Sequence, residues 1–231
     1  IDQNSFELKK KFTISRGSRN SAEVLTVSIR DREFIGLGEC VPYKRYGESL
    51  ESVSKDILSV PLPVNNQDLQ KILKPGAARN ALDCALWDLK SKKEGKPVWK
   101  LLNLKKPKPT ITAYTISLST PEKMMLEAKS KSNYPILKVK LGGQSDEKCI
   151  KAVREGSPNA RIIVDANEGW TIESYNYLVP IFKIIGVELI EQPFPSNKDY
   201  LLKKLDRQIP ICADESCHDL NGLKKLIGLY D

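Results

Sequence analysis

This 231-residue sequence has little histidine and little cysteine: it contains one histidine and five cysteines, and the cysteines form no paired motif. An odd number of cysteines without a paired motif is typical of a protein in a reducing compartment. No apolar run approaches the roughly 18 residues of a membrane span, and no signal peptide is visible. We therefore expect a cytoplasmic protein with no membrane partner. The chain starts at Ile1 rather than at methionine, so we expect its natural N-terminus to lie upstream.

Signatures of nucleic-acid binding are also absent, although the formal net charge is +8. The sequence has no arginine-rich stretch, no aromatic RNA-binding signature and no zinc finger. Its lysines are scattered over expected helix faces and loops that also carry Asp or Glu. We interpret the positive charge as a solvated surface rather than a nucleic-acid interface; it is compatible with a modest attraction for anionic substrates.

The remaining composition is that of an ordinary globular protein, with 40% hydrophobic and 29% charged residues. This length allows one or two domains with a large core. Residues 1–40 alternate in strand fashion, and a turn at 31–33 predicts antiparallel strands over 24–29 and 34–39. Helical periodicity then predicts three helices, at 48–58, 66–73 and 77–93. A segment rich in lysine and proline at 105–109 predicts a linker.

From Thr110 onward, expected strands alternate with expected helices. We predict strands at 111–117, 136–141, 161–165, 187–191 and 209–214. We predict helices at 121–132, 145–155, 171–184, 198–206 and 219–228. This alternation is typical of an α/β fold with a parallel sheet.

Three acidic residues stand at the ends of three of these apolar strands: Asp165, Glu191 and Asp214. They are 26 and 23 residues apart, about the length of one β/α unit, so the parallel strands bring them to one rim. Each acid alone would be interpreted as a strand-end or helix N-terminal cap. Together they form a hard oxygen site for a divalent cation, typically Mg²⁺, with Mn²⁺ as the alternative.

Two lysines, Lys138 and Lys140, end the neighbouring strand. Side chains two residues apart on a strand share a face, so both should point toward the acidic residues. Their mutual repulsion and a nearby metal would lower the pKa of Lys140, which could then act as a neutral base. A metal beside a lysine base is the equipment for abstracting a proton next to a carboxylate.

Other polar residues near these motifs have simpler interpretations. We expect His218 to be structural or exposed rather than a ligand. The Gly142-Gly143 pair predicts a loop, because the Gly-x-Gly spacing of a phosphate cradle is missing. Asn167 could cap the following helix or form a hydrogen bond near the metal, and the sequence leaves both open. Glu215 alone could be a surface acid.

Four short motifs carry a family resemblance: Lys138-Val139-Lys140, Val164-Asp165-Ala166-Asn167, Glu191-Gln192-Pro193 and Ala213-Asp214-Glu215-Ser216. Together they resemble the signature of the enolase superfamily, in its muconate lactonizing enzyme-like branch, whose members pair a lysine or histidine base with Mg²⁺. Further segments are similar to dipeptide epimerases of the L-Ala-D/L-Glu type. These segments cover residues 14–19, 38–48, 76–89 and 211–218.

The resemblance implies an α+β capping domain over residues 1–108, followed by a modified (β/α) TIM-type barrel over 109–231 that carries the metal site. A closed (β/α)₈ barrel needs eight strands, and only about five are expected here. The resemblance also implies a second catalytic lysine at the end of the sixth barrel strand, just after Asp231. We therefore interpret the sequence as the N-terminal two-thirds or so of a longer protein.

The resemblance further assigns residue roles. Lys140 would move the α-proton, Lys138 would stabilise the developing charge, and Glu215 and Asn167 would lie next to the metal ligands. Arg16, in a loop of the capping domain, would contact the glutamate side-chain carboxylate of a dipeptide, a geometry that suits a guanidinium. Thr115, at the end of the first barrel strand, would contact the dipeptide backbone.

The implied function is a Mg²⁺-dependent epimerase that interconverts L-Ala-L-Glu and L-Ala-D-Glu or similar dipeptides, working as a homo-oligomer. Within the superfamily, an N-acylamino acid racemase or an o-succinylbenzoate synthase would share the same motifs. From a different class, the chain could be a catalytically inactive basic binding protein on the same fold. The four intact motifs argue against that last alternative.

Overall fold

The computed structural model describes all 231 residues and divides the chain into two compact units. The first unit contains Ile1–Lys9 and Asn20–Pro109, and the second contains Lys10–Arg19 and Thr110–Asp231. The tip of the first hairpin, residues 10–19, therefore belongs to the second unit although it lies near the start of the sequence. None of the helices combines the length and the hydrophobicity that crossing a membrane requires.

A three-stranded sheet in the order β1-β2-β3 opens the chain, with bounds β1 (Asp2–Ile14), β2 (Gly17–Asp31) and β3 (Phe34–Cys40). β2 and β3 pair antiparallel, with Val27 opposite Gly38. The predicted strands at 24–29 and 34–39 are confirmed. The structure extends β2 well beyond the predicted segment and adds the long β1.

The helices of the first unit are α1 (Leu50–Leu58), α2 (Asn66–Ile72), α3 (Ala77–Glu94) and the short α4 (Val98–Leu101), preceded by the 3₁₀-helix η1 (Lys44–Tyr46). α3 ends at Gly95, whose φ of 60° is the left-handed conformation that glycine tolerates. α3 packs so closely on β3 that only glycine fits at Gly38: a Cβ there would lie 1.9 Å from the carbonyl oxygen of Ala81. The three helices predicted from periodicity are confirmed.

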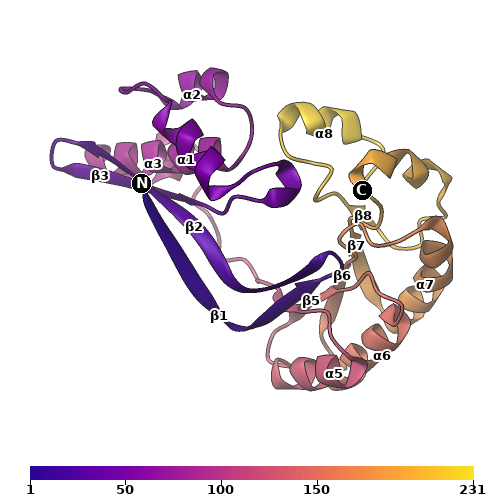
Figure 1. Cartoon of the computed structure of the whole chain (residues 1–231). Coiled ribbons are helices and arrows are strands. Elements are labelled where there is room, and N and C mark those ends of the chain that lie inside the picture. Colours follow the sequence, from indigo (N-terminus) through magenta and orange to yellow (C-terminus); the bar gives the residue numbers. More distant parts are fainter. The chain divides into compact units, whose positions relative to one another are not determined.

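The second unit is built on five parallel strands in the order β4-β5-β6-β7-β8, so the predicted α/β fold is confirmed (Figure 1). The strands are β4 (Tyr114–Ile116), β5 (Ile136–Lys140), β6 (Arg161–Asp165), β7 (Val187–Glu191) and β8 (Ile211–Cys212). The intervening helices are α5 (Pro121–Ser130), α6 (Asp146–Gly156), α7 (Ile172–Ile185), the 3₁₀-helix η2 (Ser196–Lys204) and α8 (Leu220–Leu226).

Two of these elements are much shorter than predicted. β4 has three residues instead of the expected seven at 111–117, and β8 has two instead of the expected six at 209–214. At β8 the cause is visible, because the backbone N–H of Asp214 donates to the side chain of Gln192 rather than to a neighbouring strand. The segment expected as a helix at 198–206 is the 3₁₀-helix η2, with a non-helical residue at Lys198.

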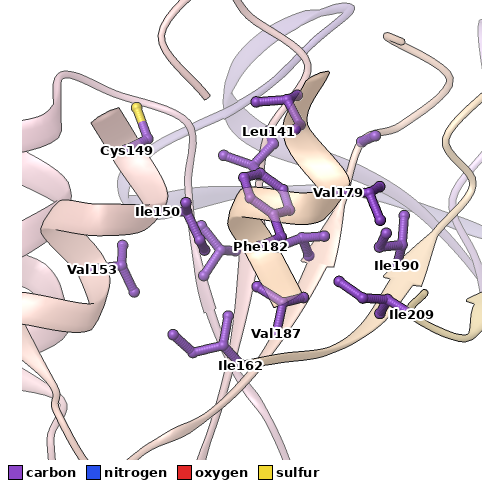
Figure 2. Close-up of a cluster of buried hydrophobic side chains, with 14 of the residues drawn as sticks. Leu141, Cys149, Ile150, Val153, Ile162, Val179, Phe182, Val187, Ile190 and Ile209 are labelled. Carbon is purple, nitrogen blue, oxygen red and sulfur yellow. The ribbon is translucent and has the colours of Figure 1, made fainter. Parts of the chain in front are cut away.

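Alternation along the strands separates the core from the polar face of the sheet. Leu137 and Val139 on β5, and Val164 on β6, are fully buried against α6 and α7. Figure 2 shows this core, in which Ile150 and Phe182 from the helices meet the strand side chains. The alternate strand residues therefore point to the opposite face, and these include the lysines and acids singled out from the sequence.

Helix α7 contributes the fully buried side chain of Phe182 to the core, and we expect this side chain to stabilise the fold strongly. Phe182 on this helix is 0% exposed, whereas Ile184 two residues later is 87% exposed. We expect Phe182→Ala to lower the free energy of unfolding by about 3–5 kcal/mol, because it leaves a cavity in the packed interior. The control Ile184→Ala should change it by less than about 0.5 kcal/mol. Denaturant unfolding followed by circular dichroism measures both, and equal losses would contradict this assignment of the core.

Candidate active site

Three carboxylates meet at the ends of the parallel strands. Asp165 ends β6 and Glu191 ends β7, and the two residues are direct register partners. Asp214 lies two residues beyond β8. One carboxylate oxygen from each of the three residues lies within 4.8 Å of the others. The structure thus brings together the three predicted metal ligands, and this all-oxygen set suits a hard divalent cation such as Mg²⁺.

Both predicted lysines point into the same cluster. The Nζ atom of Lys140 lies 2.7 Å from Oδ2 of Asp165. The Nζ atom of Lys138 lies 3.0 Å from the same oxygen and 2.7 Å from Glu191. The Asp165 side chain is fully buried. Its burial therefore depends on these two ammonium groups, since an unpaired carboxylate would be very costly to bury.

The pKa values of the site report these charges. Burial alone would raise the pKa of Asp165, but Lys140 and Lys138 outweigh it and hold that pKa below its usual range. Burial raises the pKa of Glu191 despite the hydrogen bond from Lys138. Burial also raises the pKa of Asp214, and the charges of Glu215 and Asp165 add to the effect. Two of the three acids are therefore still destabilised as anions, a cost that a bound cation would offset.

Arg16, at the tip of the first hairpin, adds a third cation to the site. Its guanidinium donates to Oε1 of Glu215 at 2.7 Å and to Oε2 of Glu168 at 3.0 Å. It also donates to the carbonyl oxygen of Asn167 at 2.6 Å. The predicted substrate-binding arginine is thus next to the metal-site acids, and its partners in this structure are carboxylates of the chain itself.

Counting formal charges gives a simple test of whether a divalent cation fits. The site acids are Asp165, Glu168, Glu191, Asp214 and Glu215, and the site cations are Arg16, Lys138 and Lys140. Five negative groups face three positive ones, which leaves a formal charge of −2. A single Mg²⁺ or Mn²⁺ would neutralise it, so the residues present fit the expected metal.

Asn167 and Glu215 lie beside the ligands. The backbone N–H of Asn167 donates to Oδ1 of Asp165 at 2.9 Å, and its side-chain amide donates to Oε1 of Glu215 at 3.3 Å. Thr171, rather than Asn167, caps α7. Of the two alternatives for Asn167, the structure therefore shows the hydrogen bonds beside the acids and not the helix cap. Oδ1 of Asn167 and Oε2 of Glu215 are buried and make no hydrogen bond. Such orphaned oxygens indicate that the site is built for a further polar or cationic group.

Thr115 and Phe12 line the same region of the second unit. Thr115 on β4 is the register partner of Lys138, so its side chain shares the face that carries the lysines. Phe12 was not expected from the sequence. Its ring centroid lies 5.9 Å from Nζ of Lys140, within the range of a cation–π contact. An aromatic residue in an alternating strand gives no signal of this role.

His218 and the Gly142-Gly143 pair behave as the sequence predicts. His218 is exposed and lies outside the acidic cluster. The N–H groups of both glycines donate to the Asp146 carboxylate at 2.9 Å, so the loop binds a side chain of the chain rather than a phosphate. Gly142 has a φ of 110°, and a Cβ there would lie 2.7 Å from Cβ of Ser15.

Asp146, on the first turn of α6, is a site-supporting residue that sequence reasoning missed. Its carboxylate is 2% exposed and also accepts a hydrogen bond from the indole N–H of Trp170 at 2.8 Å. It therefore joins the loop that follows Lys140 to the loop that follows Asp165. The only sequence signal was an acid three residues after a Gly-Gly pair, which is common in loops.

Strained backbone marks the loops after β6 and β7. Asn167, Glu168 and Gln192 have φ values of 45°, 64° and 36°, in the left-handed region. Such conformations cost about 1–3 kcal/mol each in residues other than glycine and concentrate at functional sites. All three residues directly follow the metal-site acids or lie within three positions of them.

Two family models match the chain. "Mandelate racemase / muconate lactonizing enzyme, N-terminal domain" matches residues 2–103, and "Enolase C-terminal domain-like" matches residues 122–229. The chain belongs to the mandelate racemase/muconate lactonizing enzyme branch of the enolase superfamily. The resemblance seen in the four sequence motifs is therefore confirmed.

Two curated relatives are about equally similar. The chain is 40% identical to the L-Ala-D/L-Glu epimerase of Escherichia coli, over 100% of this chain and 74% of the relative. It is 39% identical to the N-acetyl-D-glutamate racemase of a Pseudoalteromonas species, over 90% of this chain and 67% of the relative. The names of these two relatives thus describe glutamate substrates with two different groups on the nitrogen, an alanyl residue and an acetyl group.

Solved structures give the same family. An enolase family member from Agrobacterium tumefaciens, with bound sodium and L-Ala-L-Glu, has a TM-score of 0.95 and 45% identity, covering 100% of this chain and 72% of that one. The dipeptide epimerase of Cytophaga hutchinsonii, complexed with Mg and D-Ala-L-Val, has a TM-score of 0.90 and 29% identity. The match covers 98% of this chain and 67% of that one.

The metal site makes a direct prediction. Mg²⁺ should raise the melting temperature of the protein, since a ligand at 100 times its Kd stabilises the folded state by about 2.7 kcal/mol. Glu191→Gln should raise the Mg²⁺ dissociation constant at least about tenfold. Glu188→Gln is a matched control on the same strand, because Glu188 is exposed and pairs with Arg161.

Calorimetric titration of the two variants and the wild type gives the comparison. Glu188→Gln should bind Mg²⁺ as the wild type does, and EDTA should reverse the thermal shift. Equal Mg²⁺ affinities of Glu191→Gln and the wild type would rule Glu191 out as a ligand.

Proposed function

We propose that this chain forms the metal-binding and proton-transferring part of an epimerase that inverts the α-carbon of an N-acylated glutamate, with L-Ala-L-Glu as the preferred substrate. One observation carries the proposal. The lysine pair Lys138 and Lys140 shares one sheet face with Asp165, Glu191 and Asp214, at hydrogen-bond distance from two of them. A base beside a divalent-cation site is what removal of a proton next to a carboxylate requires.

Asp165, Glu191 and Asp214 would hold the cation. When bound, it would attract the substrate's α-carboxylate and lower the energy of the negative charge that develops there during proton removal. The chain's own residues do the rest. Asn167 and Glu215 hold the ligand-bearing loops, and Phe12 shields Lys140 from one side.

Lys140 would take the α-proton from one face of the substrate. Its Nζ atom lies on the sheet face that carries the three acids, 2.7 Å from Oδ2 of Asp165. Lys138 would remain charged, because its hydrogen bond to Glu191 and the charges of Asp165 and Glu191 outweigh burial and raise its pKa. A permanent ammonium there would stabilise the developing negative charge. The second base, expected on a sixth barrel strand for the opposite face, stays a prediction.

Arg16 supports glutamate as the epimerised residue. Its guanidinium already binds two carboxylates, Glu168 and Glu215, and 32% of its side chain remains exposed. A substrate carboxylate could share or replace one of these partners, since guanidinium forks bind carboxylates in pairs. We further propose that Thr115 contacts the substrate backbone, because it shares the sheet face with Lys138.

A second candidate substrate is N-acetylglutamate. The near relative from Pseudoalteromonas carries that name, and it is nearly as similar as the E. coli dipeptide epimerase. The two substrates differ only in the group attached to the glutamate nitrogen, an alanyl residue with a free amine or an acetyl group. Measuring kcat/KM for L-Ala-L-Glu and N-acetyl-L-glutamate in parallel decides between them.

Three broader expectations belong to the same proposal. We propose that residues 1–108 act as the capping domain and residues 109–231 as the barrel, and the two family models match on either side of this boundary. A cytoplasmic location is supported by the five free cysteines. A homo-oligomer that binds neither nucleic acid nor membranes stays a prediction.

The role of Lys140 can be tested by isotope exchange. Lys140→Ala should abolish α-proton exchange in D₂O from one enantiomer of the glutamyl residue and lower epimerisation by about 10²–10⁴-fold. Lys140→Arg should not restore it, because guanidinium stays protonated at any working pH. Lys151→Ala is the control, since Lys151 is exposed and pairs with Glu147. Proton NMR follows the exchange, and epimerisation at the wild-type rate in Lys140→Ala would refute the assignment.

The role of Arg16 is tested by a ratio. Arg16→Ala removes a charged contact worth about 1.5–3 kcal/mol, or roughly 10- to 150-fold in kcat/KM for L-Ala-L-Glu. L-Ala-L-Leu has no side-chain carboxylate to lose and should be affected much less. The same substitution also removes the partner of Glu215, which affects both substrates alike. The ratio of the two kcat/KM values cancels that common effect.

Arg30→Ala, at an exposed position near the end of β2, serves as the control and should leave the ratio of the two kcat/KM values unchanged. A ratio that is the same in Arg16→Ala and in the wild type would mean that Arg16 only holds the loop. Glutamate specificity would then have to come from another residue.

A further inference from the structure

Asp214 is the one candidate ligand that no strand pairing holds in place. Asp165 and Glu191 are the last residues of β6 and β7 and pair with each other in the ladder. The pairing of β7 with β8 ends at Glu191 and Cys212. Asp214 lies two residues farther along, in the turn that follows β8, so another interaction must fix its position.

That interaction comes from Gln192, the residue after Glu191. Its side-chain Oε1 accepts the backbone N–H of Asp214 at 2.9 Å and the backbone N–H of Ser216 at 3.2 Å. Gln192 is 0% exposed, so these bonds have no competition from water. One amide oxygen thus holds both sides of the Asp214-Glu215 pair to the end of β7.

The other side of the amide fixes its orientation. Nε2 of Gln192 donates to the carbonyl oxygen of Phe194 at 3.0 Å and lies 2.8 Å from Oγ of Ser216 and 2.9 Å from the hydroxyl of Tyr230. A flipped amide would place its NH₂ group against two backbone N–H groups, which can only donate. The arrangement therefore has one stable orientation.

Asp199 on η2 completes the network. The hydroxyls of Ser216 and Tyr230 both donate to its Oδ1 atom, at 2.9 Å and 2.7 Å. Because each hydroxyl donates its only proton to Asp199, both hydroxyl oxygens can only accept from Gln192, whose two N–H groups are shared among these oxygens and the carbonyl oxygen of Phe194. Burial raises the pKa of Tyr230, which keeps this hydroxyl protonated. Each polar group of this network thus has a partner within hydrogen-bond distance.

The backbone of Gln192 is tied to both neighbouring loops. Its N–H donates to the carbonyl oxygen of Cys212 at 2.9 Å, and its carbonyl oxygen accepts the N–H of Glu168 at 2.8 Å. Its φ of 36° is strained for a residue with a side chain. The strained turn sends the side chain along the rim toward Asp214, in place of the normal extension of the strand.

We propose that Gln192 is a positioning residue that holds Asp214 at the distance from Asp165 and Glu191 that divalent-cation binding requires, with Ser216, Tyr230 and Asp199 supporting its amide. This inference rests on the proposed metal-dependent function. It assigns the geometry of the third ligand to a neutral amide that does not itself contact the cation.

The test measures Mg²⁺ affinity directly by calorimetry on the full-length protein. Gln192→Leu keeps a similar volume and removes both polar groups. We expect it to weaken Mg²⁺ binding by about 10–100-fold, the usual effect of losing a group that orients a metal ligand. Gln208→Leu is the control, since Gln208 is exposed just before β8 and bonds only to Asp206 at 2.9 Å; it should leave the affinity unchanged.

A positioning role is separated from a general structural one by two readouts. The melting temperature in EDTA reports the metal-free fold. The dependence of activity on Mg²⁺ concentration reports the site: in Gln192→Leu, activity lost at low Mg²⁺ should return at high Mg²⁺. A defect that high Mg²⁺ does not rescue, with unchanged Mg²⁺ affinity, would overturn the proposal.

Tyr230→Phe keeps the test decisive if Gln192→Leu does not fold. It removes the hydroxyl that links the Gln192 amide to Asp199 and should weaken Mg²⁺ binding about 2- to 10-fold, the range expected for one hydrogen bond. Wild-type affinity in Tyr230→Phe would then overturn the proposal. A wild-type protein that binds no Mg²⁺ would instead overturn the metal-dependent function on which the proposal rests.

Discussion

Repulsion among carboxylates is the constraint on which the site depends. Three acids have oxygens within 4.8 Å of one another, and two more acids, Glu168 and Glu215, adjoin them. Like charges this close would drive the strand ends apart unless cations offset them. Lys138, Lys140 and Arg16 do so in part, and the remaining formal charge of −2 matches one divalent cation. Of the two lysines that pair with these acids, we propose that Lys140 moves the proton and that Lys138 stabilises the negative charge that develops.

The two faces of the parallel sheet have different roles: one packs in the hydrophobic core, and the other carries the charged side chains of the site. One face is buried against α6 and α7 and fixes the strands by hydrophobic packing. The other face is left for charged side chains, because alternate residues of each strand point to it. Strand pairing holds Asp165 and Glu191, whereas the backbone N–H of Asp214 donates to the buried amide of Gln192. Strand pairing thus fixes two of the three candidate ligands, and we propose that the polar network around Gln192 fixes the third.

The first hairpin shows how a distant segment joins this site. Residues 10–19 pack with the second unit, where Ser15 and Arg16 both donate to the carbonyl oxygen of Asn167. Gly142 makes this approach possible, since a side chain there would collide with Ser15. The strained loop at Asn167 and Glu168 therefore contacts the candidate metal ligand Asp165 on one side and the hairpin on the other.

The sequence by itself determined the α/β order and the strand-end positions of Lys138, Lys140, Asp165 and Glu191. Strand periodicity and β/α spacing are local properties, and they are enough to place those side chains on one rim. Only the tertiary structure decided the partners of Arg16, the contacts of Asp146, Phe12 and Gln192, and the early end of β8. These depend on contacts between residues up to 199 positions apart, such as Arg16 with Glu215, which no local pattern encodes.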